Sequence, residues 1–317
     1  MAMQTAPTIV GIDVAKAELV TYRADLDRVR TLDNEHKAID RWLATLPAGS
    51  LIAIEATNDY HLEVLERAHA LGHCPYVVDG YRLSHYRKGT GERVKTDARD
   101  ARLLARYLGH EQAHLRPWSP PPAAYRRLQQ LLRRRAALVR TRTALKQSFA
   151  GATAAAMLEP VLAGLRQLEA QLQRELLQVA EQAGLADPVQ RCQAVEGIGP
   201  LTACALNMAY LRGPFRHSDA FIAFLGLDVR IRDSGRSRGR RRLTKQGDPE
   251  LRRLLYNAAM AASRSQTWQP FYQRHLDRGL TRIQALVALA RKLARVAFAL
   301  IRHQTQYQPR LAGCEGT

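Results

Sequence analysis

The sequence predicts an α/β domain at the start of the chain, followed by a remainder that is almost entirely helical. Three observations indicate this organisation. Short apolar runs alternate with amphipathic stretches from Thr8 to about residue 115, as in a domain that alternates strands and helices. The proline-rich segment 117–122 interrupts regular structure, and long stretches rich in Leu, Ala, Arg and Gln follow it. We therefore expect modules at 1–115, 116–188 and 189–302, and a tail at 303–317.

The elements of the first module follow from its hydrophobic periodicity. Apolar runs predict strands, and the amphipathic stretches between them predict helices. Gly72 follows the second of these helices, at the place where a helix C-terminus favours glycine. The expected strands are Thr8–Ile12, Leu19–Tyr22, Leu51–Ile54 and Pro75–Val78, and the expected helices are Lys37–Leu46, Tyr60–Leu71 and Thr96–Gly109.

The second module is predicted to be a helical hairpin or a coiled coil. Leucines recur at near-heptad spacing in residues 123–150 and again in residues 157–184. This spacing places them on one face of each helix, where two helices can pack along their length. We expect this module to serve in oligomerisation or as a lever that acts on RNA or DNA.

The third module begins with the signature of a helix-hairpin-helix motif. Gly197 and Gly199 lie just ahead of an apolar helical stretch, in Val195-Glu196-Gly197-Ile198-Gly199-Pro200. Two glycines let a backbone approach a phosphate, and the following helix offers free N–H groups to it. The alternative is a tight turn between helices that binds no ligand. The basic residues around the motif favour contact with phosphate.

The charge of the chain is large and unevenly distributed. The formal net charge is +19 and the pI is about 10.4, which indicates a polyanionic partner. Residues 1–115 carry 15 Lys or Arg against 16 Asp or Glu, whereas residues 191–317 carry 22 against 8. A ribosomal-type protein would more often spread its charge or place it in tails. Segregated charge favours a nucleic-acid enzyme with separate binding modules.

Cysteine usage and hydropathy argue against a zinc-binding protein, a disulfide-stabilised protein and a membrane-spanning protein. The four cysteines contain no C-x-x-C pair, so neither a zinc site nor a disulfide framework is supported. No apolar stretch approaches the length of a membrane span, and the N-terminus lacks a signal-peptide pattern. We therefore expect a cytoplasmic protein without a membrane partner.

Four acidic residues occur where a metal-dependent phosphodiester enzyme would need them. Asp13 and Glu55 each close a short apolar run that is typical of a buried strand. Asp97 and Asp100 lie three residues apart, on one face of an expected helix. Helix capping would account for this second pair and leaves the first pair unexplained. Because buried unpaired carboxylates are costly and hard cations such as Mg²⁺ prefer oxygen ligands, we expect a divalent metal on all four.

An Arg-rich stretch interrupts the helical pattern of the third module between Asp228 and Gly247. Sequence rich in Ser, Gly and Arg is usually a flexible loop that binds nucleic acid. A serine hydroxyl beside glycine and several arginines could also attack a phosphate, because guanidinium groups stabilise the charge of the transition state. The residues expected to bind nucleic acid here and in the helix that follows are Arg236, Arg238, Arg240, Arg241, Arg242, Lys245, Arg252 and Arg253.

These motifs resemble the DEDD transposases of the insertion sequence 110 family. The resemblance lies in residues 11–16, 54–57 and 95–101, and in the later pattern of Gly-Leu, Ser-Gly, Thr-Lys-x-Gly and Leu-Arg-Arg. It implies an N-terminal RuvC-like domain of RNase H fold and a mostly helical C-terminal transposase domain. It also implies that Asp13, Glu55, Asp97 and Asp100 ligate Mg²⁺, with Mn²⁺ as the other candidate ion. Asn58-Asp59 departs from the Gly-x of many relatives, which we expect to alter a loop and not the ligands.

The resemblance also assigns a nucleophile and partners. The family's nucleophilic serine precedes the first glycine of the basic turn, a position held here by Ser234, with Ser237 as the fallback. It implies a homo-oligomer, a dimer or a tetramer, in which the RuvC-like domain of one subunit faces the serine loop of another. It further implies a non-coding bridge RNA that pairs with donor and target DNA.

Three functional hypotheses follow from the sequence. The preferred one is a DNA recombinase that mobilises its own insertion sequence through a covalent phosphoserine link. The alternative is a metal-dependent endonuclease of the Holliday-junction type that uses water as the nucleophile, with the serine loop as a clamp. The third is a nucleic-acid-binding protein without catalytic activity.

Overall fold

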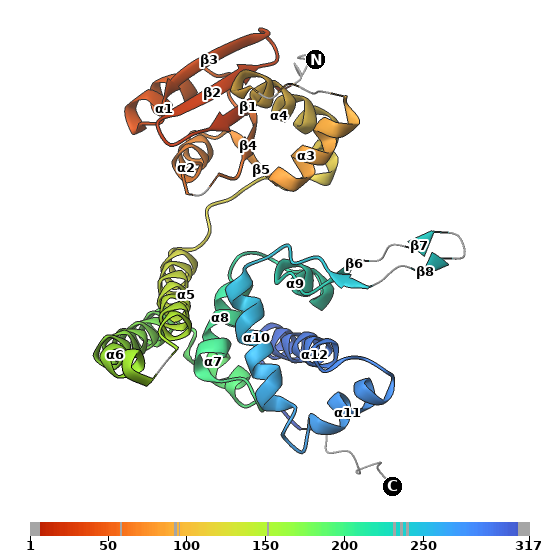
Figure 1. Cartoon of the computed structure of the whole chain (residues 1–317). Helices are drawn as coiled ribbons and strands as arrows, with labels where there is room; N and C mark the ends of the chain where they lie inside the picture. The colour runs from red at the N-terminus through yellow and green to blue at the C-terminus, as the bar shows by residue number, and fades with distance from the viewer. Residues whose placement is uncertain are drawn as a thin grey trace. The chain divides into compact units, whose positions relative to one another are not determined.

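The computed structural model describes residues 7–57, 59–91, 94, 96–150, 152–230, 233–234, 237–238 and 241–309. The chain divides into two compact units, the first ending at Pro120 and the second beginning at Pro121 (Figure 1). The first unit is a mixed α/β structure, and the second is mostly helical, as the sequence predicts.

The first unit is built on one five-stranded sheet with the strand order β3-β2-β1-β4-β5. Strands β1, β4 and β5 are parallel, while β2 is antiparallel to both of its neighbours. The four predicted strands are confirmed, but the edge strand β3 was not predicted because its exposed residues include Arg28, Arg30 and Asp33. The strands are β1 (Ile9–Val14), β2 (Glu18–Arg23), β3 (Arg28–Asp33), β4 (Leu51–Glu55) and β5 (Cys74–Val78).

Helices cover both faces of this sheet (Figure 1). Helices α1 (His36–Leu43) and α2 (Leu62–Ala70) pack on one face, against a core that includes Val10, Ile12 and Ile54. Helices α3 (Gly80–Gly89) and α4 (Asp97–Glu111) pack on the other, and the short helix η1 (Gln112–His114) follows α4. Because strand side chains alternate between faces, Gly11, Asp13 and Glu55 belong to the face covered by α3 and α4.

The sequence did not predict α3. Only Leu83 of its ten residues is buried, so the segment carries no apolar periodicity from which a helix could be inferred. The predicted helices at Lys37–Leu46, Tyr60–Leu71 and Thr96–Gly109 are confirmed as α1, α2 and α4.

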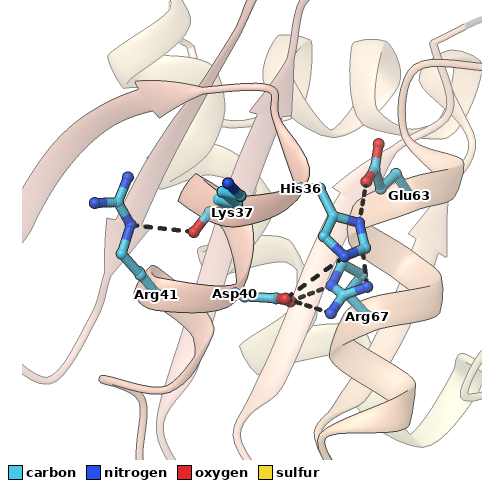
Figure 2. Close-up of polar contacts among 6 residues, drawn as sticks. All are labelled: His36, Lys37, Asp40, Arg41, Glu63 and Arg67. Atoms are coloured by element: carbon cyan, nitrogen blue, oxygen red, sulfur yellow. Dashed lines mark hydrogen bonds and ion pairs between the residues drawn. The ribbon is translucent and has the colours of Figure 1, made fainter.

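A surface network of charged residues joins α1 to α2 (Figure 2). Arg67 of α2 forms a bidentate ion pair with Asp40 of α1, and it lowers the pKa of that carboxyl group. His36 extends the network, with its Nδ1 atom 2.9 Å from Oε1 of Glu63. The network holds together the two helices on the face opposite the acidic residues. Exposed ion pairs of this kind contribute little to stability individually.

The second unit is a helical assembly around a single hydrophobic core. Helices α5 and α6 form the predicted helical hairpin, with Arg127 paired to Glu175 and Arg142 paired to Glu169. Leucines of this hairpin, including Leu128 and Leu131, belong to the same core as the later helices. The helices are α5 (Ala123–Ser148), α6 (Ala152–Gln182), α7 (Ala186–Gln193), α8 (Pro200–Tyr210), α9 (Ser218–Phe224), α10 (Pro249–Ala262), α11 (Gln269–Asp277) and α12 (Arg282–His303).

Gly11 allows α4 to lie directly on the backbone of β1. A Cβ atom on Gly11 would lie 1.9 Å from the carbonyl oxygen of Ala101 and 2.7 Å from the amide nitrogen of Ala105. Neither neighbour is a side chain that could move aside. Glycine is therefore required at this point of the strand by the approach of the helix.

We expect Gly11→Ala to destabilise the first unit by about 3 kcal/mol or more, because the added methyl group overlaps the backbone of α4. Chemical or thermal unfolding followed by circular dichroism measures this loss. Gly89→Ala in the same unit is the matched control, since a Cβ there meets no atom within 4 Å. Equal stability of the two variants would contradict the proposed role of Gly11.

Candidate carboxylate site and serine arm

Asp13 and Glu55 lie side by side at the ends of two parallel strands. The register pairs Ile12 of β1 with Ile54 of β4, so the next residue of each strand is one of these acids. Neighbouring strands are separated by about 4.8 Å, and both acids lie on the face that α3 and α4 cover. The sequence placed each acid at a strand end, and the sheet topology brings the two together.

The first turn of α4 brings Asp97 and Asp100 to the same place. Thr96 caps the helix by accepting a hydrogen bond from the amide of Arg99, and Asp97 is the first helical residue. Asp100 is only 2% exposed. It immediately precedes Ala101, whose carbonyl group lies over Gly11. The close contact of α4 with β1 therefore sets the position of Asp100 relative to Asp13.

Glu55 lies against the first turn of α3. A Cβ atom on Gly80, the first residue of that helix, would come within 2.5 Å of Oε1 of Glu55. A side chain at position 80 would therefore displace the carboxylate. The partial positive charge at the N-terminus of a helix favours an anion in this place.

The four acids Asp13, Glu55, Asp97 and Asp100 form what we call the carboxylate cluster. Burial, together with the negative charges of Asp100, Asp97 and Glu55, raises the pKa of Asp13 to about 6. No basic residue of the described part of the chain acts on the pKa of Asp13, and a divalent ion would remove the repulsion between these like charges. A set of four carboxylates suits a hard cation, although no three of the described acids, histidines or cysteines already form a metal-ligand group.

Arg87 of α3 contributes a basic side chain to this site, and sequence reasoning missed it. Its Nη2 atom lies 2.7 Å from Oδ1 of Asp100, and the two side chains are 19% and 3% exposed. The pair is therefore largely buried, which makes its removal from either side costly. Arg87 orients Asp100 beside Asp13 and balances one of the charges in the cluster. No pattern signalled it, because α3 itself has none.

Gly197 of the helix-hairpin-helix turn has a packing role. Its φ angle is +92°, and a Cβ there would lie 2.4 Å from the carbonyl oxygen of Ala258 in α10. Gly199 is the N-cap of α8, where a Cβ would meet no atom within 4 Å and no side chain caps the helix. Contact of Gly199 with phosphate stays a prediction, and close packing on α10 accounts for the glycine at position 197.

Glu196, which immediately precedes Gly197, was also missed. Its carboxylate accepts hydrogen bonds from Thr267, from the indole nitrogen of Trp268 and from the hydroxyl group of Tyr307. These bonds lower the pKa of Glu196 against the effect of its burial. They fasten the turn to the segment before α11 and to the chain beyond α12.

The Arg-rich stretch forms a two-stranded ribbon, which we call the serine arm (residues 229–243; Figure 1). At its base β6 (Val229–Arg230) pairs with β9 (Arg242–Leu243), and farther out β7 (Asp233–Ser234) pairs with β8 (Ser237–Arg238). Ser234 stands directly opposite Ser237 in this pairing. The two candidate nucleophiles are therefore backbone partners on adjacent strands, where the sequence had predicted a loop.

The base of the arm explains the glycines and part of the basic motif around it. Gly226 has a φ angle of +68°, and a Cβ on Gly247 would lie 2.7 Å from the amide nitrogen of Gly226. Arg252 donates to the carbonyl group of Gly247 at 2.7 Å. Asp228 and Thr244 are joined by a backbone and a side-chain hydrogen bond. These contacts hold the two ends of the arm together where the arm joins the helical core.

The predicted nucleic-acid-binding residues therefore differ in their surroundings. Arg252 supports the base of the arm, and Arg253 forms a bidentate ion pair with the buried Glu250. Arg241, Arg242 and Lys245 are exposed. The backbone of Arg238 lies in β8, and Arg236 and Arg240 fall outside the described residues, as do Asn58 and Lys95 of the first unit.

Comparisons with known proteins match both halves of this architecture. A family model described as "Transposase", for the DEDD transposases of the IS110 type, matches residues 10–153. A second model, described as "Transposase IS116/IS110/IS902 family", matches residues 189–273. The chain belongs to the IS110 family of transposases. This transposase is thus an enzyme that cleaves and joins DNA, and such DEDD transposases typically use a divalent metal ion.

Individual relatives resemble the transposase over most of its length. A "Probable family 20 transposase" of Pseudomonas aeruginosa is 29% identical over 95% of this chain and 98% of its own. A "Pilin gene-inverting protein" of Moraxella bovis is 28% identical over 82% of each chain. Among the described helices of the transposase, none combines the length and the apolar character that crossing a membrane requires.

The raised pKa of Asp13 predicts how metal-free stability depends on pH. The folded protein binds a proton at Asp13 that the unfolded chain releases near pH 4, so stability falls as pH rises from about 4 through 6. We expect Asp13→Asn to stabilise the metal-free protein at pH 7.5, on the order of 1 kcal/mol after allowing for solvent screening.

Urea unfolding in a chelating buffer at pH 7.5 and pH 4 measures this effect. The variant and the wild type should be equally stable at pH 4, and Mg²⁺ or Mn²⁺ at pH 7.5 should stabilise only the wild type. A variant less stable than the wild type at pH 7.5 without metal would contradict the repulsion inferred for the cluster.

Removing Arg87 should destabilise the first unit much more than removing an exposed pair. We expect Arg87→Ala to cost about 3 kcal/mol, because the buried Asp100 loses a close ion-pair partner. Asp27→Asn is the control, since it removes the charge from an exposed pair with Arg102 while Asn tolerates the positive φ angle of this residue, and it should cost less than about 1 kcal/mol. Unfolding free energies in urea measure both, and similar small losses would show that the Arg87 pair is not buried.

Proposed function

We propose that this transposase is a Mg²⁺-dependent DNA recombinase that cuts with the hydroxyl group of Ser234 and so mobilises its own insertion sequence. The observation that carries the proposal is the gathering of three carboxylates, those of Glu55, Asp97 and Asp100, around the fourth, Asp13. The family membership supplies the reaction class, because both matching models describe transposases.

A RuvC-like, RNase H-type domain is the fold we propose for the first unit. The strand order β3-β2-β1-β4-β5, with β2 antiparallel to its neighbours, is consistent with it. In that arrangement the carboxyl ends of β1 and β4 carry one pair of acids. A helix packed on β1 carries the other pair. Mn²⁺ would satisfy the same oxygen ligands.

The proposed chemistry exchanges one phosphoester for another. The Ser234 oxygen bonds to the scissile phosphorus and loses its proton to solvent, while the bond from phosphorus to the 3′ oxygen breaks and that oxygen takes up a proton. A divalent ion on the cluster would supply positive charge to the phosphate oxygens. Because each broken ester is replaced by another, the reverse attack by a 3′ hydroxyl rejoins strands without an external source of energy.

The proposed partners are DNA, a bridge RNA and further copies of the chain. The basic second unit would bind donor and target DNA and a bridge RNA that pairs with both, since its positive charge suits the backbone of either nucleic acid. A homo-oligomer, a dimer or a tetramer, would bring the carboxylates of one subunit to the serine of another. The gene-inverting activity named for the Moraxella bovis relative supports strand exchange over simple cleavage.

A covalent protein–DNA adduct tests the proposal. With labelled substrate DNA, its guide RNA and Mg²⁺, we expect the wild type and Ser237→Ala to yield an adduct that survives denaturing electrophoresis. Ser234→Ala should yield none and should lose recombination by at least about a thousandfold, as with other nucleophiles that act within a catalytic unit.

Ser234→Ala and Ser237→Ala form a matched pair of variants, because the two serines are backbone partners in the same ribbon. Their comparison distinguishes a serine recombinase from an endonuclease that uses water. DNA cleavage retained by Ser234→Ala without an adduct would establish the water-using endonuclease instead. Asp13→Asn should abolish cleavage under either mechanism. Unchanged activity in Asp13→Asn would leave only binding as the function.

A further inference from the structure

A groove of about 690 Å³ lies between the base of the serine arm and α12. Its basic lining residues are Arg241 and Arg242 from the arm and Arg291 from α12. Val229 and Leu243 are among its apolar lining residues, and none of the described residues that line it is acidic. The groove therefore combines three cationic side chains with apolar surface that would not repel sugars or bases.

Among the described residues, Arg291 differs from its helix neighbour Arg295 in forming no hydrogen bond or ion pair. Arg295 forms an ion pair with Asp219 at 2.6 Å. Asp228, the other acid whose charge acts on Arg291, accepts a hydrogen bond from Thr244. Within the part of the chain that the structure describes, the guanidinium group of Arg291 makes no hydrogen bond or ion pair, and its Nε atom is buried.

A buried donor without an acceptor costs free energy, which an incoming acceptor recovers. Phosphate oxygens are good acceptors for a guanidinium group, because the pairing is both charged and planar. Arg291 is only half-buried and lines an open groove, so an anion can reach it. Arg242 lies in the same groove, exposed to solvent, and adds a second positive charge.

We infer that this groove binds the phosphodiester backbone of a nucleic-acid strand, with Arg291 as the anchoring residue and Arg242 beside it. The inference rests on the proposed function in one respect, that the serine arm acts on DNA. It adds a contact that places a strand along the base of the arm. The strand comes from duplex DNA, single-stranded DNA or the guide RNA, which share this backbone chemistry.

Fluorescence anisotropy with the full chain tests the groove. Labelled duplex DNA, single-stranded DNA and RNA of one sequence are titrated over a series of salt concentrations with the wild type, Arg291→Gln and Arg295→Gln. For at least one probe, Arg291→Gln should weaken binding roughly tenfold and reduce the salt slope by about 0.7–1. Arg295→Gln removes the same charge from the same helix and should change both quantities by much less. The probe with the largest effect identifies the source of the strand.

Stability provides an independent readout. Because Arg291 forms no hydrogen bond or ion pair with the described residues, the free energy of unfolding of Arg291→Gln in urea should be no lower than that of the wild type. Wild-type affinity and salt slope in Arg291→Gln for all three probes, or equal losses in Arg295→Gln, would overturn the assignment. Failure of the proposed function looks different. It would be seen as absence of the covalent adduct while the Arg291 effect on binding persists.

Discussion

The contact between the backbone of α4 and the backbone of β1 at Gly11 sets the geometry of the first unit. It fixes the height of the helix above the sheet, and with it the distance from Asp100 to Asp13. Glu55 depends on a similar absence of a side chain at Gly80. The absence of a side chain at Gly11 and at Gly80 therefore leaves the space in which the carboxylate cluster forms. The acids themselves lie on strands and a packed helix, which are rigid elements. Sites on strands and packed helices are located more precisely than sites on loops.

Charge is divided between the two units in a way that suits their separate tasks. The first unit is nearly neutral in sum, yet it concentrates four carboxylates at one place and compensates them in part with Arg87. The second unit carries most of the positive charge, and its exposed arginines include Arg241 and Arg242 at the base of the serine arm, beside the groove at α12. Several of its arginines instead support the fold, including Arg252 at the base of the arm and Arg253 on Glu250.

Much of this could be read from the sequence, and the failures have physical causes. β1 and β4 were predictable because each is an apolar run closed by one acid, whereas β3 and α3 lack any apolar periodicity. Arg87 was missed together with the helix that carries it. Gly197 looked like a phosphate-binding glycine, but its neighbour in α10 lies some sixty residues away, and no local pattern reveals such a contact. The sequence predicted a loop where the serine arm lies, because strands of only two residues show no periodic alternation of apolar and polar residues.

The electrostatic cost of the carboxylate cluster has a consequence beyond catalysis. An ion that binds only the folded chain stabilises it in proportion to the logarithm of its concentration. A cation on the cluster therefore protects the first unit from opening, and proteases digest chains chiefly in their opened state. Under the proposed mechanism, the concentration of that ion would set the lifetime of the folded chain as well as the rate of the reaction. When the ion became scarce, such a transposase would be degraded as well as slowed.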